Sequence, residues 1–344
     1  MWTLICFSWP REVIKTALAR SSTAPIIIHL SCGDIPGSDD STLLLKTRTY
    51  QETLGSFTRL KSLVLDDLGR RCLTINQIIQ TISDNPSLEG LSLFRFYATV
   101  DSTLTKSKTA LVAPPKLRIF RVETSVACLY DLMTRLELPL SMEEVVIIAS
   151  ATESSWQLRE SSVSSWIHAM QPLSSIVQRL HSEHDGSTIF LEDGGRCSWT
   201  TNGGIGGFEF QVGGLNHRLG LECIGSLANE LDCASGLPDL QLVSDSAFSA
   251  ADSTLVALNR VKTLASIEIR IGRKHTHIDQ LVEFISRMLD NAQDDRIDFP
   301  SLHTLSVCGR ESDLDEIADK LQQRYSDDPP RPPYQLVLDV TFWD

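Results

Sequence analysis

Two histidine clusters have the residue types and spacing that best fit metal or acid–base chemistry. The first, HSEHD, contains His181, Glu183, His184 and Asp185, and histidines three residues apart share one face of a helix. Zinc needs three or four ligands, and no further cluster completes this set. We favour a solvated helix C-terminus, where cationic histidines meet the helix dipole.

The second cluster, KHTHID, contains His275, His277 and Asp279. The two histidines could clamp a metal from one side of a strand. We favour instead a helix that begins near Ile278 and is capped by Thr276 or His277. The sequence therefore predicts no metal ion.

Other catalytic signatures are incomplete. The segment TNGGIGGFEF is rich in glycine, but it lacks the Lys-Ser/Thr ending of a phosphate loop and precedes a strand rather than a helix. Ser164 and Ser165 lie outside any G-x-S-x-G turn, and no recognisable signature flanks Cys197. We expect no cofactor and no catalytic residue, and so predict that the protein is not an enzyme.

The composition bears on partners and location. The net charge of the 344-residue chain is -13, and no basic run supplies the face that nucleic acid requires, so a basic or neutral protein partner fits better. No stretch approaches the roughly 20 apolar residues that cross a bilayer, and no membrane partner is expected. Eight cysteines without a C-x-x-C pair, and an N-terminus without a signal pattern, predict a cytoplasmic or nuclear protein.

An apolar spacing, L-x-x-L-x-L, recurs along nearly the whole chain. Its first match is Leu60, Leu63 and Leu65, and further or degenerate matches begin at Leu88, Leu117, Met142, Leu237, Leu264 and Leu302. Apart from the longer gap between Met142 and Leu237, the matches recur at intervals of roughly 25 to 50 residues, which is typical of repeat architectures. Between matches the apolar period changes from two to 3.6, as in a helix over 75–82 that begins with a capping box of Thr74 and Gln77.

These patterns predict an α/β fold, namely a leucine-rich-repeat-like solenoid with a mostly parallel sheet on its concave side and helices outside. Residues 1–150 would form N-terminal repeats, 151–215 an irregular helical and hairpin insertion, and 216–344 C-terminal repeats with a cap. In the irregular centre, strand-like runs over 188–192 and 208–212 flank a polar, glycine-rich loop. We expect a hairpin or two degenerate repeats there, within one continuous solenoid.

The strand motif resembles that of leucine-rich-repeat proteins. The ladder position that holds Asn or Cys in that family is here Leu68, Phe96, Ser125, Asp245 and Arg310. Uneven repeats without this ladder are similar to the divergent leucine-rich regions of fungal F-box proteins. The first thirty residues, with Trp2, an amphipathic helix and an Ala24-Pro25 turn, resemble the stretch that follows the F-box. This resemblance covers most of the chain.

The resemblance implies capture of a substrate or partner on a curved surface, with no cofactor. The F-box itself, which docks the Skp-type adaptor of a cullin ubiquitin ligase, would precede Met1 and is not visible in this chain. The adaptor is therefore an expected partner only where an upstream F-box exists.

The segment SLFRFYA, at the end of a repeat strand, contains Phe94, Arg95, Phe96 and Tyr97. Aromatic residues and Arg commonly anchor interfaces, so these four are the candidate partner-binding residues. The alternative, which we favour for at least one of them, is that Phe94 or Phe96 packs in the core.

We therefore expect a non-catalytic protein–protein interaction module, which could be the substrate-recognition part of an F-box-type ubiquitin ligase subunit. The opposing hypothesis is an α/β enzyme whose active site lies in the irregular central segment, with HSEHD or the glycine-rich loop contributing.

Overall fold

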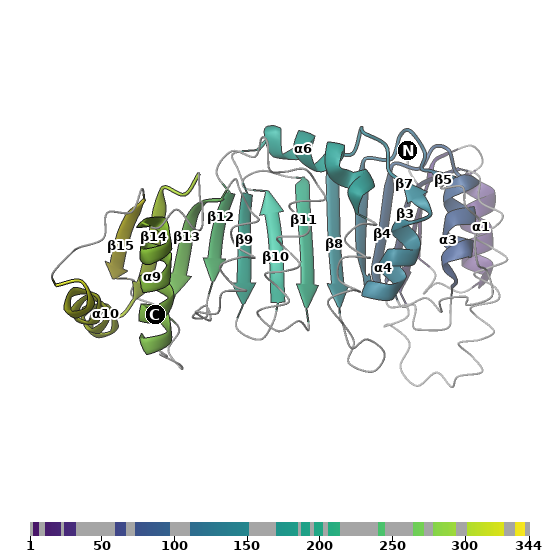
Figure 1. The fold of residues 1–344 in the computed structure, drawn as a ribbon. Helices are drawn as coiled ribbons and strands as arrows, with labels where there is room; N and C mark the ends of the chain where they lie inside the picture. The colour runs from purple at the N-terminus through teal and green to yellow at the C-terminus, as the bar shows by residue number, and fades with distance from the viewer. Residues whose placement is uncertain are drawn as a thin grey trace. The chain divides into compact units, whose positions relative to one another are not determined.

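The chain divides into two compact units, Met1–Trp156 (unit 1) and Gln157–Asp344 (unit 2). The computed structural model (Figure 1) describes residues 3–6, 11–21, 24–31, 59–66, 73–96, 111–150, 170–184, 187–192, 196–201, 206–213, 240–244, 264–271, 278–293, 301–326 and 334–340. The division falls inside the segment predicted to be irregular, 151–215. Among the described helices, none is long and apolar enough to cross a membrane.

Unit 1 contains a parallel sheet. Its strands pair in the order β1 (Thr3–Cys6), β2 (Ile26–Ser31), β3 (Leu60–Asp66), β4 (Gly90–Phe96), β6 (Ile119–Ser125) and β8 (Glu144–Ser150). The helices α1 (Arg11–Ser21), α3 (Ile75–Ser83) and α4 (Val126–Met133) lie in the connections, and α3 packs beside α4 (Figure 1). Each connection steps to the next strand in the same direction, and right-handed crossovers then place the helices on one face. A small parallel pair, β5 (Leu111–Val112) with β7 (Leu136–Glu137), lies outside this sheet.

The L-x-x-L-x-L positions form the core of the strands. Leu60, Leu63 and Leu65 are at most 1% exposed. Their counterparts from Leu88, Leu117, Met142, Leu264 and Leu302 onward are at most 3% exposed. The match that begins at Leu237 lies partly outside the described residues. Because side chains alternate along a strand, the intervening residues point to the opposite face.

The predicted capping box is present at the start of α3. The Gln77 N–H donates to Thr74 Oγ1 at 3.3 Å, and the Thr74 N–H donates to Gln77 Oε1 at 2.8 Å. The helix buries Ile75, Ile78 and Ile82. Local sequence and tertiary burial therefore specify the same helix.

Unit 2 contains a mixed sheet. Its strands pair in the order β11 (Gly207–Gly213), β10 (Arg196–Thr201), β9 (Ser187–Glu192), β12 (Leu240–Ser244), β13 (Leu264–Arg270), β14 (Thr304–Gly309) and β15 (Gln335–Val340). The first three strands are antiparallel, and the pairs from β9 to β15 are parallel. A short 3-10 turn, η1 (Gln171–Leu173), leads into α6 (Ser174–Ser182), and α9 (Ile278–Gln293) and α10 (Glu311–Arg324) follow β13 and β14.

The irregular centre differs from its prediction. The polar loop expected between 188–192 and 208–212 contains strand β10, which pairs with β9 on one side and β11 on the other. This is a three-stranded antiparallel meander, so the expectation of a hairpin or two degenerate repeats was wrong. Cys197 and Trp199 are buried there and alternate with Ser198 and Thr200, a period of two that the neighbouring polar residues obscure.

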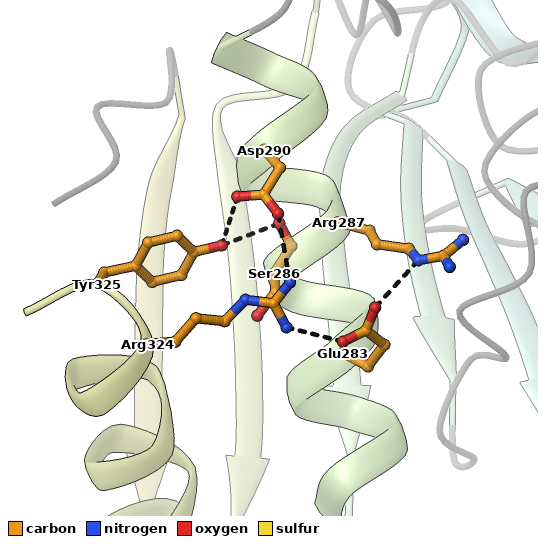
Figure 2. Close-up of polar contacts among 6 residues, drawn as sticks. All are labelled: Glu283, Ser286, Arg287, Asp290, Arg324 and Tyr325. Carbon is orange, nitrogen blue, oxygen red and sulfur yellow. Dashed lines mark hydrogen bonds and ion pairs between the residues drawn. The ribbon is translucent and has the colours of Figure 1, made fainter. Parts of the chain in front are cut away.

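Polar contacts join α9 to α10 (Figure 2). The single O–H of Tyr325 is shared between two acceptors, Asp290 Oδ1 at 2.7 Å and the Ser286 carbonyl at 3.1 Å. Arg324 donates to Glu283 Oε2 at 2.8 Å and holds the pKa of that carboxyl below its usual range. Burial, followed by the bond to Asp290, raises the pKa of Tyr325 to about 12. These contacts fix one helix against the other.

The predicted α/β class with a mostly parallel sheet and helices is confirmed by this arrangement. The helix predicted to begin near Ile278 is present as α9, and both α9 and α10 bury apolar residues.

Candidate partner-binding face

The strands β3, β4, β6 and β8 carry a second row of side chains opposite the core, here called the open face. It consists of Ser62, Val64, Asp66, Gly90, Ser92, Phe94, Ile119, Arg121, Glu123, Glu144, Val146 and Ile148. All are partly exposed except Gly90 and Ser92, which are buried. The register aligns Val64, Ser92, Arg121 and Val146 across the four strands. The face therefore mixes apolar, hydroxyl and charged groups.

A bulge interrupts this regular face at the end of β4. Leu93 lies opposite Val122 and Phe96 lies opposite Thr124, so two residues of β4, Phe94 and Arg95, oppose the single residue between Val122 and Thr124. This two-against-one count defines a β-bulge. Arg95 has φ 47° and is the only non-glycine residue with a positive φ among those that the structure describes.

The bulge decides where the predicted partner-binding residues point. Phe94 is partly exposed on the open face, and Arg95 is exposed, with its Nη2 2.9 Å from Asp66 Oδ1. Phe96 is 3% exposed and belongs to the core, as the alternative prediction allowed. Tyr97 lies outside the described residues. Without the extra residue, strict alternation would have turned Arg95 rather than Phe96 toward the core.

Hydroxyl groups join the strand ends beside the bulge. The hydroxyl of Thr124 donates to the Phe96 carbonyl, and the hydroxyl of Ser150 donates to the Thr124 carbonyl at 3.5 Å. These bonds connect β4 to β6 and β6 to β8 near the ends of the strands. This role was not predicted from the sequence, although Thr124 and Ser150 follow the apolar matches that end at Val122 and Ile147.

Ion pairs connect neighbouring strands of unit 1. Arg121 forms a two-bond contact with Glu144, with N···O distances of 2.5 and 2.9 Å. Lys61 lies 2.8 Å from Glu89 at the beginning of β3 and β4. Of these residues, Arg121 and Glu144 belong to the open face. Their bonds to each other orient both side chains, which can also form hydrogen bonds with a partner.

In the first histidine cluster, HSEHD, the ring of His181 is not solvated. His181 is 1% exposed, and its Nδ1 lies 2.5 Å from the hydroxyl of Ser187. Burial, with a smaller contribution from His184, lowers the pKa of His181 to about 4. The interpretation of His181 as a solvated cation at a helix end was wrong, because the ring packs in the core against Trp199 at a centroid distance of 5.6 Å.

The remaining candidate residues that the structure describes have separate contacts. His184 Nδ1 lies 2.5 Å from the Leu180 carbonyl, and Asp185 lies outside the described residues. His275 and His277 also lie outside them, and Asp279 is exposed and contacts Lys320 at 2.7 Å. Cys197 is fully buried. Among the described residues, no group of three or more His, Cys, Asp or Glu could hold a metal ion.

Of the four residues predicted to bind a partner, Phe94 is partly exposed and Arg95 is exposed at the end of β4. This strand end offers an aromatic ring and a guanidinium beside the Asp66 carboxylate of the neighbouring strand β3. Comparison with known proteins identified no matching family model and no matching curated protein.

Proposed function

We propose that this protein is a non-catalytic protein–protein interaction module and that the open face of unit 1 contacts the partner. The observation that carries this proposal is the bulge at Phe94 and Arg95. A positive φ at a non-glycine residue costs about 1–2 kcal/mol. Such a conformation keeps Arg95 at the surface beside Phe94, and aromatic and Arg side chains are the usual anchors of interfaces.

The repeat spacing supports an extended repeat surface. The motifs of β3, β4, β6 and β8 begin at Leu60, Leu88, Leu117 and Met142, which are 28, 29 and 25 residues apart. Equivalent motif positions pair in register across these strands, as Leu63 pairs with Leu91 and Phe120 pairs with Val145. We propose that the chain is a leucine-rich-repeat-like solenoid, in which stacked strands present one continuous binding face.

The resemblance to divergent F-box proteins narrows the proposed role to substrate recognition for a ubiquitin ligase. In this proposal the open face holds the substrate, and a Skp-type adaptor binds only through an F-box upstream of Met1. The net charge of -13 resides in residues 157–344, because residues 1–156 hold 16 Lys or Arg and 16 Asp or Glu. The net charge therefore does not select the substrate of the open face.

Affinity purification from the source cells followed by mass spectrometry tests this role. The tagged chain would be compared with a form that carries the upstream genomic sequence and with a Phe94→Ser, Arg95→Ser variant of each. The proposal predicts a partner that both parent forms recover and both variants lose, with adaptor and cullin recovered only with the upstream sequence. A partner retained equally by the double variants would contradict binding through the open face.

A matched control separates this effect from a general loss of apolar surface. Val112 and Leu140 are each 65% exposed and lie in or beside the β5–β7 pair rather than on the open face. A Val112→Ser, Leu140→Ser variant removes exposed apolar groups from the same unit. It is expected to recover the same partner as the parent chain.

A further inference from the structure

Strand β15 is an edge of the unit 2 sheet, since among the described strands it pairs only with β14. The Gln335 N–H donates to the His303 carbonyl at 2.8 Å and therefore points toward β14. Successive residues of a strand direct their backbone groups to opposite sides. The N–H and C=O groups of Leu336, Leu338 and Val340 consequently point toward the outer edge.

The apolar core continues onto this edge strand. Leu336 and Leu338 align with Leu305 and Val307 of β14, both of which are fully buried. On β15, Leu336 and Leu338 are partly exposed and Val340 is 40% exposed. Native edge strands are usually protected by Lys, Pro or a bulge, whereas β15 has the sequence QLVLDV, with a single charge at Asp339.

We propose that β15 pairs with β15 of a second copy of this chain, antiparallel and about a two-fold axis at Leu338. In this register Leu338 lies opposite its own counterpart, and Leu336 lies opposite Val340. All three residues direct N–H and C=O to the edge, so each of these three pairs exchanges two hydrogen bonds, about six in all. The unused backbone groups of one edge are satisfied by those of the other.

Side chains and charge are compatible with the same register. The side chains of Leu336, Leu338 and Val340 share one face, so the pairing joins two half-exposed apolar rows into one. Asp339 lies opposite Val337, which keeps the two Asp339 carboxylates from facing each other directly. A twofold interface is self-complementary in this way because the same patch serves both subunits.

The size of the contact sets its expected strength. A strand of six residues is about 20 Å long, and its edge covers much less than the roughly 800 Å² per partner of a standard stable interface. The dimer is therefore expected to dissociate on dilution in the micromolar range or above. This inference concerns unit 2 and is independent of the function proposed for unit 1.

Sedimentation equilibrium of the full chain from about 1 to 200 μM tests the proposal. The parent chain is expected to shift from monomer toward dimer. Leu338→Pro removes an edge-facing N–H without removing a bond to β14, and it should stay monomeric with an unchanged circular dichroism spectrum. Val337→Thr keeps every edge-facing group and should dimerise as the parent does. A parent chain that stays monomeric, or that forms assemblies larger than a dimer, would overturn the proposal.

Crosslinking tests the register even where Leu338→Pro does not fold. Opposed Cα atoms in a hydrogen-bonded antiparallel pair are about 5.5 Å apart, within the range of a disulfide. Leu338→Cys should therefore give an oxidised dimer above the background of the parent chain, whereas Val337→Cys, which would face Asp339, should not. Equal crosslinking at both positions, or at neither, would contradict the proposed axis.

Discussion

Asn85 Oδ1 accepts the backbone N–H of Leu60 at 2.9 Å, which joins the end of helix α3 to the beginning of strand β3. Its Nδ2 donates to the Thr81 carbonyl at 2.7 Å, and the residue is fully buried. The first N–H of a buried strand and a carbonyl of the last helical turn otherwise need partners that water cannot supply. One side chain thus satisfies a backbone group in each of two elements.

Replacing Asn85 should destabilise unit 1. Asn85→Ala leaves the Leu60 N–H and the Thr81 carbonyl without this partner, and the free energy of unfolding should fall by about 2–4 kcal/mol. Urea denaturation followed by circular dichroism measures this change. Asp84→Ala, which removes an exposed bond with Gln80, serves as the control and should cost less than about 1 kcal/mol. If the two substitutions lowered the free energy of unfolding equally, the buried Asn85 carboxamide would contribute no more to stability than the exposed Asp84 side chain.

Gly207 should tolerate no side chain. Its φ is 109°, and a Cβ there would lie 2.2 Å from Thr201 Oγ1, the atom that accepts the Phe208 N–H at 3.1 Å. We expect Gly207→Ala to lower the free energy of unfolding by at least about 2 kcal/mol. Gly213→Ala is the matched control in the same strand, because no atom lies within 4 Å of its added Cβ. A thermal melt in which both variants match the parent would contradict this account of β11.

Acid should destabilise unit 2 through His181. Its pKa is lowered from 6.5 to about 4 in the folded protein, so between these values the unfolded chain binds the proton and the folded chain does not. The contribution of His181 to the free energy of unfolding is therefore fully present above about pH 6.5. It is lost as the pH falls toward 4, which lowers the free energy of unfolding by up to about 3 kcal/mol.

The test compares unfolding free energies near pH 7 and near pH 4.5. His181→Gln should reduce the pH dependence relative to the parent chain, whereas Ser182→Ala, at an exposed position without a titrating group in the same helix, should leave it unchanged. An identical pH dependence in all three proteins would mean that His181 does not titrate as its burial predicts.

Two ion pairs of unit 1 should differ in strength. Arg121–Glu144 joins β6 to β8, and Arg118–Glu143 lies just before these strands. Arg121 binds Glu144 through two nitrogens, and the Glu144 side chain is 14% exposed, whereas Arg118 and Glu143 are each 60% exposed. Double-mutant cycles to Ala should give a coupling energy of about 1 kcal/mol for Arg121 with Glu144. The exposed pair should give about 0–0.5 kcal/mol. Equal couplings would show that partial burial does not strengthen the first pair.

Much of the fold could be predicted from local periodicity. The motif from Leu60 to Leu65 marks a strand with one buried face, and Thr74 with Gln77 marks the beginning of a helix. These features depend on residues close in sequence. Strand β10 was not predicted, because its buried Cys197 and Trp199 lie among polar and glycine residues whose local propensities favour a loop.

The candidate site could be predicted only in part. The sequence identifies Phe94 and Arg95 as aromatic and basic residues at a strand end, but the bulge depends on pairing with β6 and so on long-range register. The same applies to Asn85 and Thr124, whose partners lie 25 and 28 residues away. His181 was misassigned because the pattern of a helix end does not reveal that a neighbouring sheet buries it.

Photo-crosslinking from position 94 tests the central proposal most directly. A photoreactive phenylalanine analogue would replace Phe94 on the open face or, as the control, Leu140, which is 65% exposed outside that face, and the crosslinked proteins would be identified in the source cells. The proposal predicts a discrete partner captured from position 94 and absent from position 140. Capture of the same partner from position 140 but not from position 94 would contradict it.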